Sequence, residues 1–315
     1  MKLFYQLRLV LVVFLLAFNA FANAQTPSPP PALEMVVLGS GGPGASGRAG
    51  AGYALLLDGK PRILVDAGPG TFARVGEARL SLAAADILLL THLHVDHAGG
   101  LPGLVKARAV STRGKITFNV FGPGGSEAKD DDAAFPSTTR FMDLLFGERG
   151  AFGYLKDFSA PISFKTTDLE STPKAGAMPR MIVNEDGLVI SAIAGHHRDA
   201  PAVIYRVDYK GKSITFSGDI DPQGHADLLR IAAGTQLLVF NSVVLDPPGS
   251  PPVLYTLHTT PKDIGQIAKS LRAGQLLLSH LSPPLDQARE AVTLSIRQNY
   301  SGPILFAQDG MRLPQ

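Results

Sequence analysis

Residues 91–100 read THLHVDHAGG and directly follow an apolar run that ends at Leu90. Within six positions this stretch holds three histidines and one aspartate: His92, His94, Asp96 and His97. Imidazole and carboxylate groups are ligands of zinc and of similar divalent cations. A cluster of such groups at the end of a buried strand therefore predicts a metal site.

The spacing of these residues predicts two neighbouring metal positions. His92 and His94 are two residues apart, so in an extended turn both imidazoles project to one side and can hold one ion. Asp96 and His97 follow round the turn and can begin a second site, while the glycines at 99–100 let the backbone turn tightly. The chain contains no cysteine, so its ligands are nitrogen and oxygen only. Such a set leaves positions open for water, as catalytic sites do.

The amino-terminal residues have the pattern of a cleaved secretory signal. A basic region precedes an apolar stretch at 9–18, and Ala22 and Ala24 form an A-x-A pattern before Gln25. The apolar stretch is shorter than the roughly 20 residues that a membrane-spanning helix needs. We therefore expect residues 1–24 to be a signal peptide that is cut after Ala24. The protein would then be periplasmic or secreted, without a stable membrane anchor.

The charge of the remaining chain argues against a nucleic-acid partner. Removing residues 1–24 takes away two of the 29 basic and none of the 27 acidic residues, which leaves a formally neutral chain. Proteins that bind polyanions usually have a basic excess, because phosphate neutralisation supplies most of their affinity. Residues 25–33 are rich in proline and are expected to form an extended tether before a single domain at 34–315.

Short β-branched or leucine-rich runs separated by glycine predict strands through most of this domain. The expected strands lie at 35–38, 53–57, 62–65, 87–90, 116–121, 188–193, 203–207, 213–216, 237–240, 275–278 and 303–306. Gly211 marks a hairpin turn between two of them. Helices are expected after Gly100 and at 141–146, 226–232 and 261–273. Thr260 as N-cap, Pro261 at the first position and Gly274 just past the end mark the last helix. Many strands and few helices favour two sheets packed face to face and covered by helices.

Further polar groups also follow apolar strands. These groups are His196 with its neighbour His197, His280, and Asp219 in the stretch SITFSGD. Strand ends at one sheet edge converge in space, so these side chains can meet the cluster at 92–97. A single buried histidine is more often a hydrogen-bonded core residue, but several histidines at strand ends favour metal binding.

The pattern H-x-H-x-D-H after an apolar strand resembles the metallo-β-lactamase superfamily. The resemblance extends from VVLGSGGPG and ILVDAGPG through the histidine-rich stretch and SGD to LLLSH, nearly the whole chain after the signal. It implies an α/β fold, an αββα four-layer sandwich in which two mixed β-sheets pack face to face with helices outside.

The resemblance implies that His92, His94 and a third histidine bind the first metal. This third ligand is His197 or His196. We favour His197, because HRDAPAVIYRV resembles the family stretch in which this ligand precedes a Pro-Ala pair and a Tyr-Arg strand.

The second metal has a ligand set implied in the same way. Asp96, His97 and His280 match its ligands, and Asp219 matches the carboxylate that bridges both metals. Asp66 in VDAGPG matches an aspartate that supports the ligand loop.

The implied chemistry is metal-assisted hydrolysis. Two cations about 3.5–4 Å apart can bridge a hydroxide and lower the pKa of bound water from about 15.7 to near 7. Asp96 and Asp219 are the expected catalytic carboxylates, and Asp219 holds the ion pair and orients the nucleophile. His258, in LHTTP, resembles a histidine of ribonuclease Z-like members that protonates the leaving group or contacts the substrate. Its alternative role is that of a neighbour to the helix cap Thr260, and His225 is expected on the surface.

The order of the motifs resembles the ribonuclease Z and arylsulfatase branch. Two departures argue against tRNA 3′ processing: only 21 residues separate His197 from Asp219, too few for a tRNA-clamping arm, and Asn241 stands where a glutamate is usual. A secretory signal would also send the protein away from tRNA. We therefore expect small phosphodiesters or sulfate esters as substrates. The alternatives are hydrolysis of a lactone, a thioester or an RNA phosphodiester, and a non-enzymatic metal-holding protein.

The ligand types suit two divalent ions, with Zn²⁺ as the first choice and Mn²⁺, iron or nickel as alternatives, because selectivity depends on metal availability. Substrate contacts are expected between Phe121 and Met178. The sequence leaves the oligomeric state open, and a homodimer is the commonest soluble assembly.

Overall fold

The computed structural model describes residues 29–44, 47–127, 134–159, 161–198 and 200–315. The expected signal peptide and its cleavage point lie outside these ranges. Residues from Pro31 to Gln315 form one compact unit. Of the helices in the described ranges, none combines the length and the apolar character needed to cross a membrane.

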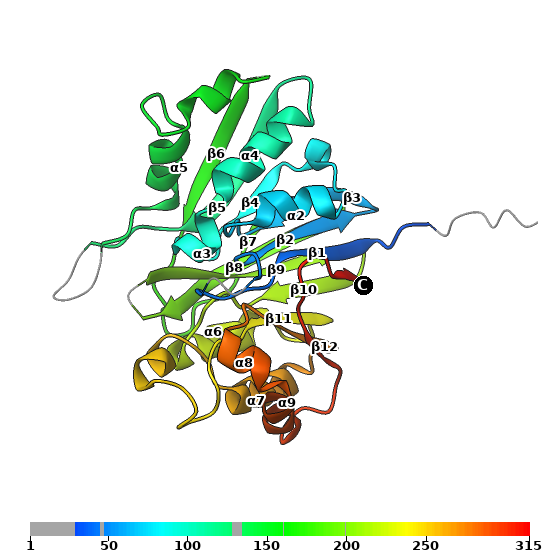
Figure 1. Ribbon diagram of the computed structural model, residues 1–315, viewed down its shortest axis with the longest axis vertical. Coiled ribbons are helices and arrows are strands. Elements are labelled where there is room, and N and C mark those ends of the chain that lie inside the picture. Colours follow the sequence, from blue (N-terminus) through cyan, green and yellow to red (C-terminus); the bar gives the residue numbers. More distant parts are fainter. Residues whose placement is uncertain (1–28, 45–46, 128–133, 160, 199) are drawn as a thin grey trace, which may run out of the picture. The chain divides into compact units, whose positions relative to one another are not determined.

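Two seven-stranded sheets form the framework of this unit (Figure 1). The first has the strand order β14-β1-β2-β3-β4-β5-β6, with the bounds β1 (Leu33–Gly39), β2 (Gly52–Leu57), β3 (Lys60–Val65), β4 (Ile87–Leu89), β5 (Ile116–Pro123), β6 (Ile162–Leu169) and β14 (Arg312–Pro314). The second has the order β13-β12-β11-β10-β9-β8-β7, with the bounds β7 (Arg180–Glu185), β8 (Leu188–His197), β9 (Ala200–Tyr209), β10 (Lys212–Phe216), β11 (Leu237–Asn241), β12 (Gln275–Ser279) and β13 (Ile304–Phe306).

The two sheets are mixed in the same way. Strands β3 to β6 run parallel in the first sheet, and β10 to β13 run parallel in the second. Antiparallel pairs join the remaining strands of each sheet. The carboxyl ends of the parallel strands therefore collect at one edge of each sheet, where open α/β sheets bind their ligands.

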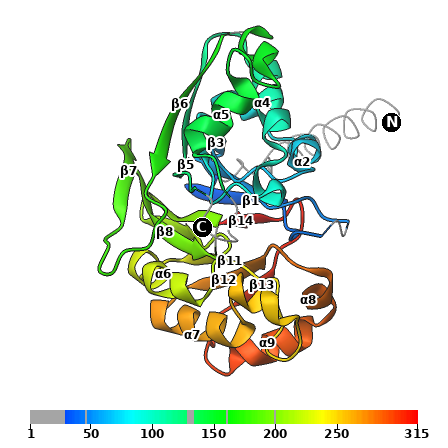
Figure 2. The same cartoon turned by 90° about the vertical axis from the view of Figure 1, so that its left-hand side faces the viewer.

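Three apolar clusters lie between the four layers of the fold, which are two sheets and two outer layers of helices. One fills the space between the sheets, where the ring centroids of Tyr53 and Phe216 lie 5.2 Å apart. The second joins the outer face of the first sheet to α2 (Thr71–Glu77), α4 (Leu101–Val110) and α5 (Thr138–Phe146). The third joins the second sheet to α6 (His225–Ile231), α7 (Pro261–Leu271) and α9 (Arg289–Arg297). These helices lie on the outer sides of the two sheets (Figure 2), so the expected αββα sandwich is confirmed.

The shorter helical segments connect these layers. They are α3 (Val95–Ala98), α8 (Pro283–Gln287) and 3₁₀ turns at Leu82–Ala84, Gly153–Asp157, Pro222–Gly224 and Pro252–Thr256.

Buried hydrogen bonds between the sheets fix the end of β4. The Tyr205 hydroxyl donates to the Leu90 carbonyl oxygen over 3.0 Å, and the Val203 amide donates to the Thr91 carbonyl oxygen over 2.8 Å. Both donors belong to β9 of the second sheet, whereas both acceptors directly precede the histidine-rich stretch. Because each broken buried hydrogen bond costs free energy, these contacts hold that stretch in a fixed place relative to the second sheet.

All eleven expected strands are present, but three strands were not predicted. Strand β7 is largely exposed at the sheet edge, and β6 carries the polar run Lys165–Asp168. Such edge strands lack the apolar pattern from which strands are recognised. The third, β14, is only three residues long.

The hairpin turn at Gly211 agrees with the prediction, whereas the end of helix α7 differs from it. Lys210 and Gly211 have φ values of 47° and 76°, which confirms the hairpin turn at Gly211. Helix α7 has Thr260 as its N-cap, as expected, but the prediction that Gly274 ends it was wrong. Arg272, with φ 52°, is the left-handed C-cap. Gly274 instead permits a close contact, because a Cβ there would lie 2.8 Å from the Gln236 carbonyl oxygen.

Candidate metal centre

The seven expected ligands meet at one edge of the sandwich, because the strands that carry them end there. His92 and His94 follow β4, Asp96 and His97 lie on α3, His197 ends β8, Asp219 follows β10, and His280 follows β12. Asp219 and His280 come from the second sheet, whereas the histidine-rich stretch comes from the first. Residues far apart in the sequence therefore form one cluster.

One group of ligand atoms consists of His92, His94 and His197. His92 Nε2 and His94 Nδ1 lie 3.1 Å apart. The His197 ring centroid lies 5.0 Å from that of His92 and 5.1 Å from that of His94. One nitrogen of each residue lies within 4.8 Å of the others, a spacing that fits ligands of one cation.

A second group consists of Asp96, His97 and His280. His280 Nε2 lies 3.0 Å from Asp96 Oδ2, and His97 Nε2 lies 4.0 Å from the same oxygen. His97 and His280 are fully buried, while Asp96 is partly exposed. This group has the nitrogen and oxygen donors for a second cation beside the first.

Asp219 lies between the two groups. Its Oδ2 is 3.9 Å from His92 Nε2, 3.7 Å from His197 Nε2 and 3.7 Å from His97 Nε2. Its Oδ1 is 3.6 Å from His280 Nδ1. One buried carboxylate thus faces the ligand atoms of both groups, the geometry that a bridging role requires.

Asn241 at the end of β11 holds this carboxylate in place. Its side-chain amide donates to Asp219 Oδ1 over 2.8 Å, and both residues are buried. With Oδ1 occupied by this donor, Oδ2 is left to face the expected ligands His92, His97 and His197. Sequence reasoning noted Asn241 as a departure from its family but did not predict this contact, since it depends on the register of β10 and β11.

Asp66 orients the ring of His97. One carboxylate oxygen accepts from the Thr91 amide over 2.8 Å, and the other accepts from the Thr91 hydroxyl over 2.8 Å and lies 2.8 Å from His97 Nδ1. The Leu257 carbonyl oxygen accepts from His197 Nδ1 in the same manner over 2.8 Å. In both rings Nδ1 is held by a partner outside the cluster, so Nε2 is the nitrogen that faces the other ligand atoms.

Two residues of the site have left-handed backbone conformations. Asp66 has φ 56° directly after β3, and His280 has φ 57° directly after β12. Non-glycine residues adopt this region at a cost of order 1–3 kcal/mol, and such residues cluster at functional sites. The backbone also packs closely here, since a Cβ on Gly68 would lie 2.2 Å from the Asp96 carbonyl oxygen.

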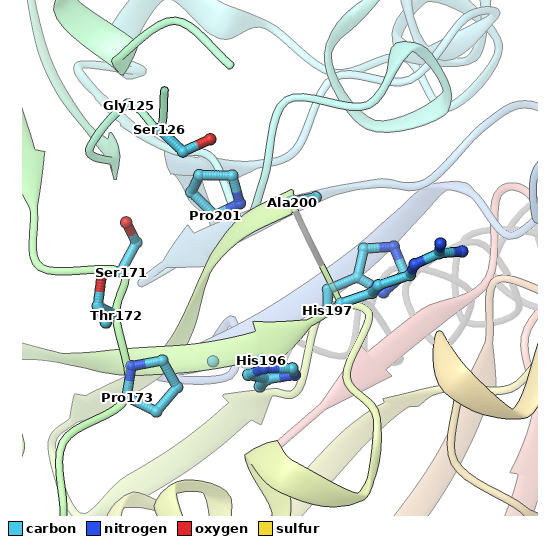
Figure 3. A pocket seen from close by; sticks show the side chains of 11 residues that line it. Gly125, Ser126, Ser171, Thr172, Pro173, His196, His197, Ala200 and Pro201 are labelled. Carbon is cyan, nitrogen blue, oxygen red and sulfur yellow. The ribbon is translucent and has the colours of Figure 1, made fainter. Parts of the chain in front are cut away.

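The structure places His197, and not His196, in the cluster. His196 Nδ1 lies 2.6 Å from Asp221 Oδ2, and the two neighbouring imidazoles point in different directions (Figure 3). Successive residues of a strand face opposite sides, so only one of the two can reach the other ligands.

His258 and His225 differ in their relation to the site. His258 is buried with Nδ1 3.9 Å from Asp219 Oδ2, so it faces the cluster and is more than a neighbour of the helix cap. The expectation that His225 lies on the surface was wrong. Its ring is half-buried, and Nε2 lies 2.9 Å from the Thr259 hydroxyl oxygen, because α6 packs against the turn that precedes α7.

The electrostatics of the cluster favour binding of cations. Burial alone would raise the pKa of Asp219, but the surrounding histidines hold that pKa well below its usual range. Burial lowers the pKa of His92 well below its usual range and lowers that of His258 to about 4. Burial also disfavours charge on His97, but Asp66 and Asp219 raise its pKa well above the usual range. An ionised carboxylate therefore lies beside the neutral rings of His92 and His258, whereas a cation bound at His97 would displace a proton.

Unpaired nitrogens provide the test of whether a metal fits. His97 Nε2, His280 Nδ1 and His258 Nδ1 are buried without a hydrogen-bond partner among the described residues. Buried polar atoms nearly always have a hydrogen-bond partner. Three buried nitrogens of the same cluster that lack one therefore need an explanation. Two divalent cations held by imidazole and carboxylate ligands account for this arrangement, and the residues present fit them.

Comparison with known proteins identifies relatives over most of the chain. The family described as "Beta-lactamase superfamily domain" matches residues 61–281. A curated protein named ribonuclease Z, from Mycobacterium sp. (strain KMS), is 26% identical over 268 residues, which cover 82% of this chain and 87% of the relative.

Solved structures have the same fold at lower identity. The short form of human tRNase Z has a TM-score of 0.66 at 20% identity, covering 89% of this chain and 98% of that one. Zn²⁺-bound PqqB from Methylobacterium extorquens has a TM-score of 0.59 at 15% identity, covering 89% and 99%. At these identities the likeness concerns the fold alone.

Asp66→Asn is expected to weaken metal retention about 10- to 100-fold, because the residue that orients His97 loses one acceptor oxygen. Asparagine keeps the size and tolerates the left-handed backbone of this position. The measurement is competition with a chromophoric chelator.

Asp186→Asn is the matched control for this variant, since Asp186 has φ 46° in an exposed turn. Equal metal retention by the two variants would contradict the role of Asp66.

Proposed function

The chain belongs to the beta-lactamase superfamily and resembles its ribonuclease Z branch, and from this premise we propose a dinuclear metal-dependent hydrolase of small phosphodiesters or sulfate esters. The observation that carries the proposal is the position of Asp219 between two groups of ligand atoms. A structural metal site is usually closed by its ligands, whereas donors shared between two cations suit hydrolysis.

The residues that would hold the two cations are those of the cluster. His92, His94 and His197 would hold the first cation and Asp96, His97 and His280 the second, with Asp219 between them. When bound, two divalent cations polarise an ester and make hydroxide available from water at neutral pH. Zn²⁺ suits this donor set best, and a fold neighbour is described as Zn²⁺-bound, while Mn²⁺, iron or nickel would also be accepted.

Three side chains of the cluster are proposed to act on the reacting groups. Asp96 is partly exposed, so it can accept a hydrogen bond from an incoming water. Asp219, held by Asn241, would help to orient that water. The unpaired Nδ1 of His258 faces the same space and can contact the ester or its leaving group.

The preference for small substrates is supported by the segment between His197 and Asp219. In this segment residues 200–216 form the hairpin of β9 and β10 with a turn at Lys210 and Gly211. Both strands are paired inside the second sheet, so this hairpin offers no protruding arm to clamp tRNA.

RNA is the second candidate substrate. The neutral charge argued against a nucleic-acid partner, but the comparisons do not support this exclusion, because the curated relative is a ribonuclease by name. Fold and metal ligands would be the same for either substrate. Only direct assay separates a small diester from a precursor tRNA.

Metal-loaded protein is expected to hydrolyse bis-p-nitrophenyl phosphate or p-nitrophenyl sulfate faster than a lactone, a thioester, nitrocefin or a precursor tRNA. The measurement is initial rate at equal metal content and moderate salt. Cleavage of the tRNA alone would replace the small-ester proposal by RNA processing. Full metal occupancy without turnover of any substrate would favour a metal-holding protein.

Asp219→Ala is expected to abolish hydrolysis and to weaken metal retention by at least about 100-fold. Loss of a residue that only orients a ligand weakens metal affinity by up to about 100-fold, and loss of a ligand itself should cost at least as much. Metal content after dialysis and rate are measured together. A fully active variant would refute the bridging role, and Asp186→Ala serves as the control at an exposed aspartate.

His258→Ala is expected to lower kcat about 100-fold, the lower range for groups that assist proton transfer, while the metal content stays unchanged. A lower rate at unchanged metal content would show that His258 contacts the substrate and does not bind the metal. Loss of metal together with activity would make His258 an eighth ligand instead.

Export to the periplasm is proposed on the signal pattern at residues 1–24. The exported protein is expected to begin at Gln25, because the A-x-A pattern places the cut after Ala24. Amino-terminal sequencing of protein recovered from the periplasm measures this. A chain that stays in the cytoplasm with Met1 intact would exclude export.

A further inference from the structure

A pocket of about 180 Å³ lies beside the metal centre (Figure 3). His197 contributes to both, so the pocket begins where the proposed first cation would be held. Its volume is below the roughly 300–1,000 Å³ of sites that enclose a whole drug-sized ligand. The pocket therefore fits one substituent of a substrate whose ester lies at the metal centre.

The chemistry of the pocket is set by His196 and Asp221. His196 Nδ1 lies 2.6 Å from Asp221 Oδ2. The same carboxylate accepts from the Arg198 amide over 3.1 Å and from the Gln223 amide over 2.8 Å, and Asp221 is buried. A carboxylate that already accepts two amide protons is an acceptor for the imidazole as well, so it holds the proton of His196 on Nδ1.

The other ring nitrogen of His196 is consequently the one that is left to contact a ligand. Nε2 has no partner among the residues that the structure describes, and the imidazole is partly exposed at the pocket. A hydroxyl group can donate to this nitrogen or accept from it, so it pairs with either protonation form of the ring. This end of the pocket therefore suits a hydroxyl group.

The remaining walls match a small hydroxylated group. Ser126, Ser171 and Thr172 add hydroxyl groups that can donate and accept, and the rings of Pro173 and Pro201 supply apolar faces (Figure 3). The Ser126 hydroxyl is buried without a partner within the described ranges. Polar groups of this kind fix the orientation of a ligand in a concave site.

We propose that this pocket is a subsite for a hydroxyl-bearing substituent of the ester, of the size of a glyceryl or pentosyl group. His196 is its specificity-determining residue, and Asp221 is the residue that positions His196. The inference rests on the proposed function, because it places the rest of that ester at the metal centre.

Binding of two phosphate monoesters to the metal-loaded full chain tests the subsite. Glycerol 3-phosphate and propyl phosphate carry the same charged group, so the exposed Arg198 at the pocket attracts both equally. Titration calorimetry is expected to show about fivefold to tenfold tighter binding of glycerol 3-phosphate, the effect of one net hydrogen bond.

Variants of His196 assign this preference to its ring. His196→Phe keeps the ring volume but removes the ring nitrogens, and it is expected to bind the two monoesters equally. His196→Gln restores a side chain that can donate and accept, and it is expected to recover part of the preference. His225→Gln, outside the pocket, should keep the full preference, and metal analysis of each variant checks that the centre is intact.

The outcomes separate the subsite from the proposed function. Equal affinities in the unchanged protein, absence of binding by either monoester, or a preference that His196→Phe leaves intact would overturn the subsite. A preference that disappears in His196→Phe supports it even if the substrate panel yields no turnover. Hydrolysis of the panel without any such preference leaves the hydrolase and removes the subsite.

Discussion

A buried carboxylate surrounded by histidines is the constraint on which the site depends. Asp219 is almost completely buried, and a charge in such a place is tolerated only when it is paired. Its neighbours come from both sheets, so the charge is compensated only when the sandwich is closed. The cluster of ligand atoms therefore assembles only when the two sheets pack together at this edge.

The residues around the ligands explain why the centre keeps its shape. Asp66, Asn241 and the Leu257 carbonyl oxygen each hold one ligand from the outside. The hydrogen bonds of Tyr205 and Val203 to the segment before His92 tie the same region to the opposite sheet. A divalent cation at the proposed site would thus meet side chains that are already oriented, which would limit the loss of side-chain entropy on binding.

Strands were predictable from the sequence wherever their burial requires a run of apolar residues. The inner strands of both sheets are continuous apolar runs because both of their faces are covered, as in β4 and β11. Edge strands β6 and β7 were missed, since exposed strands need no such pattern. The partial burial of His225 was missed because its partner Thr259 is distant in sequence.

The sequence by itself determined the ligand types, the strand ends that carry them and the resemblance from which the superfamily was recognised, because these follow from local order along the chain. Only the tertiary structure decided that His197 and not His196 joins the cluster, that Asn241 holds Asp219, and that His196, held by Asp221, lines the neighbouring pocket. These facts depend on strand register and on which face of a strand each side chain occupies, and a shift of one residue reverses the face.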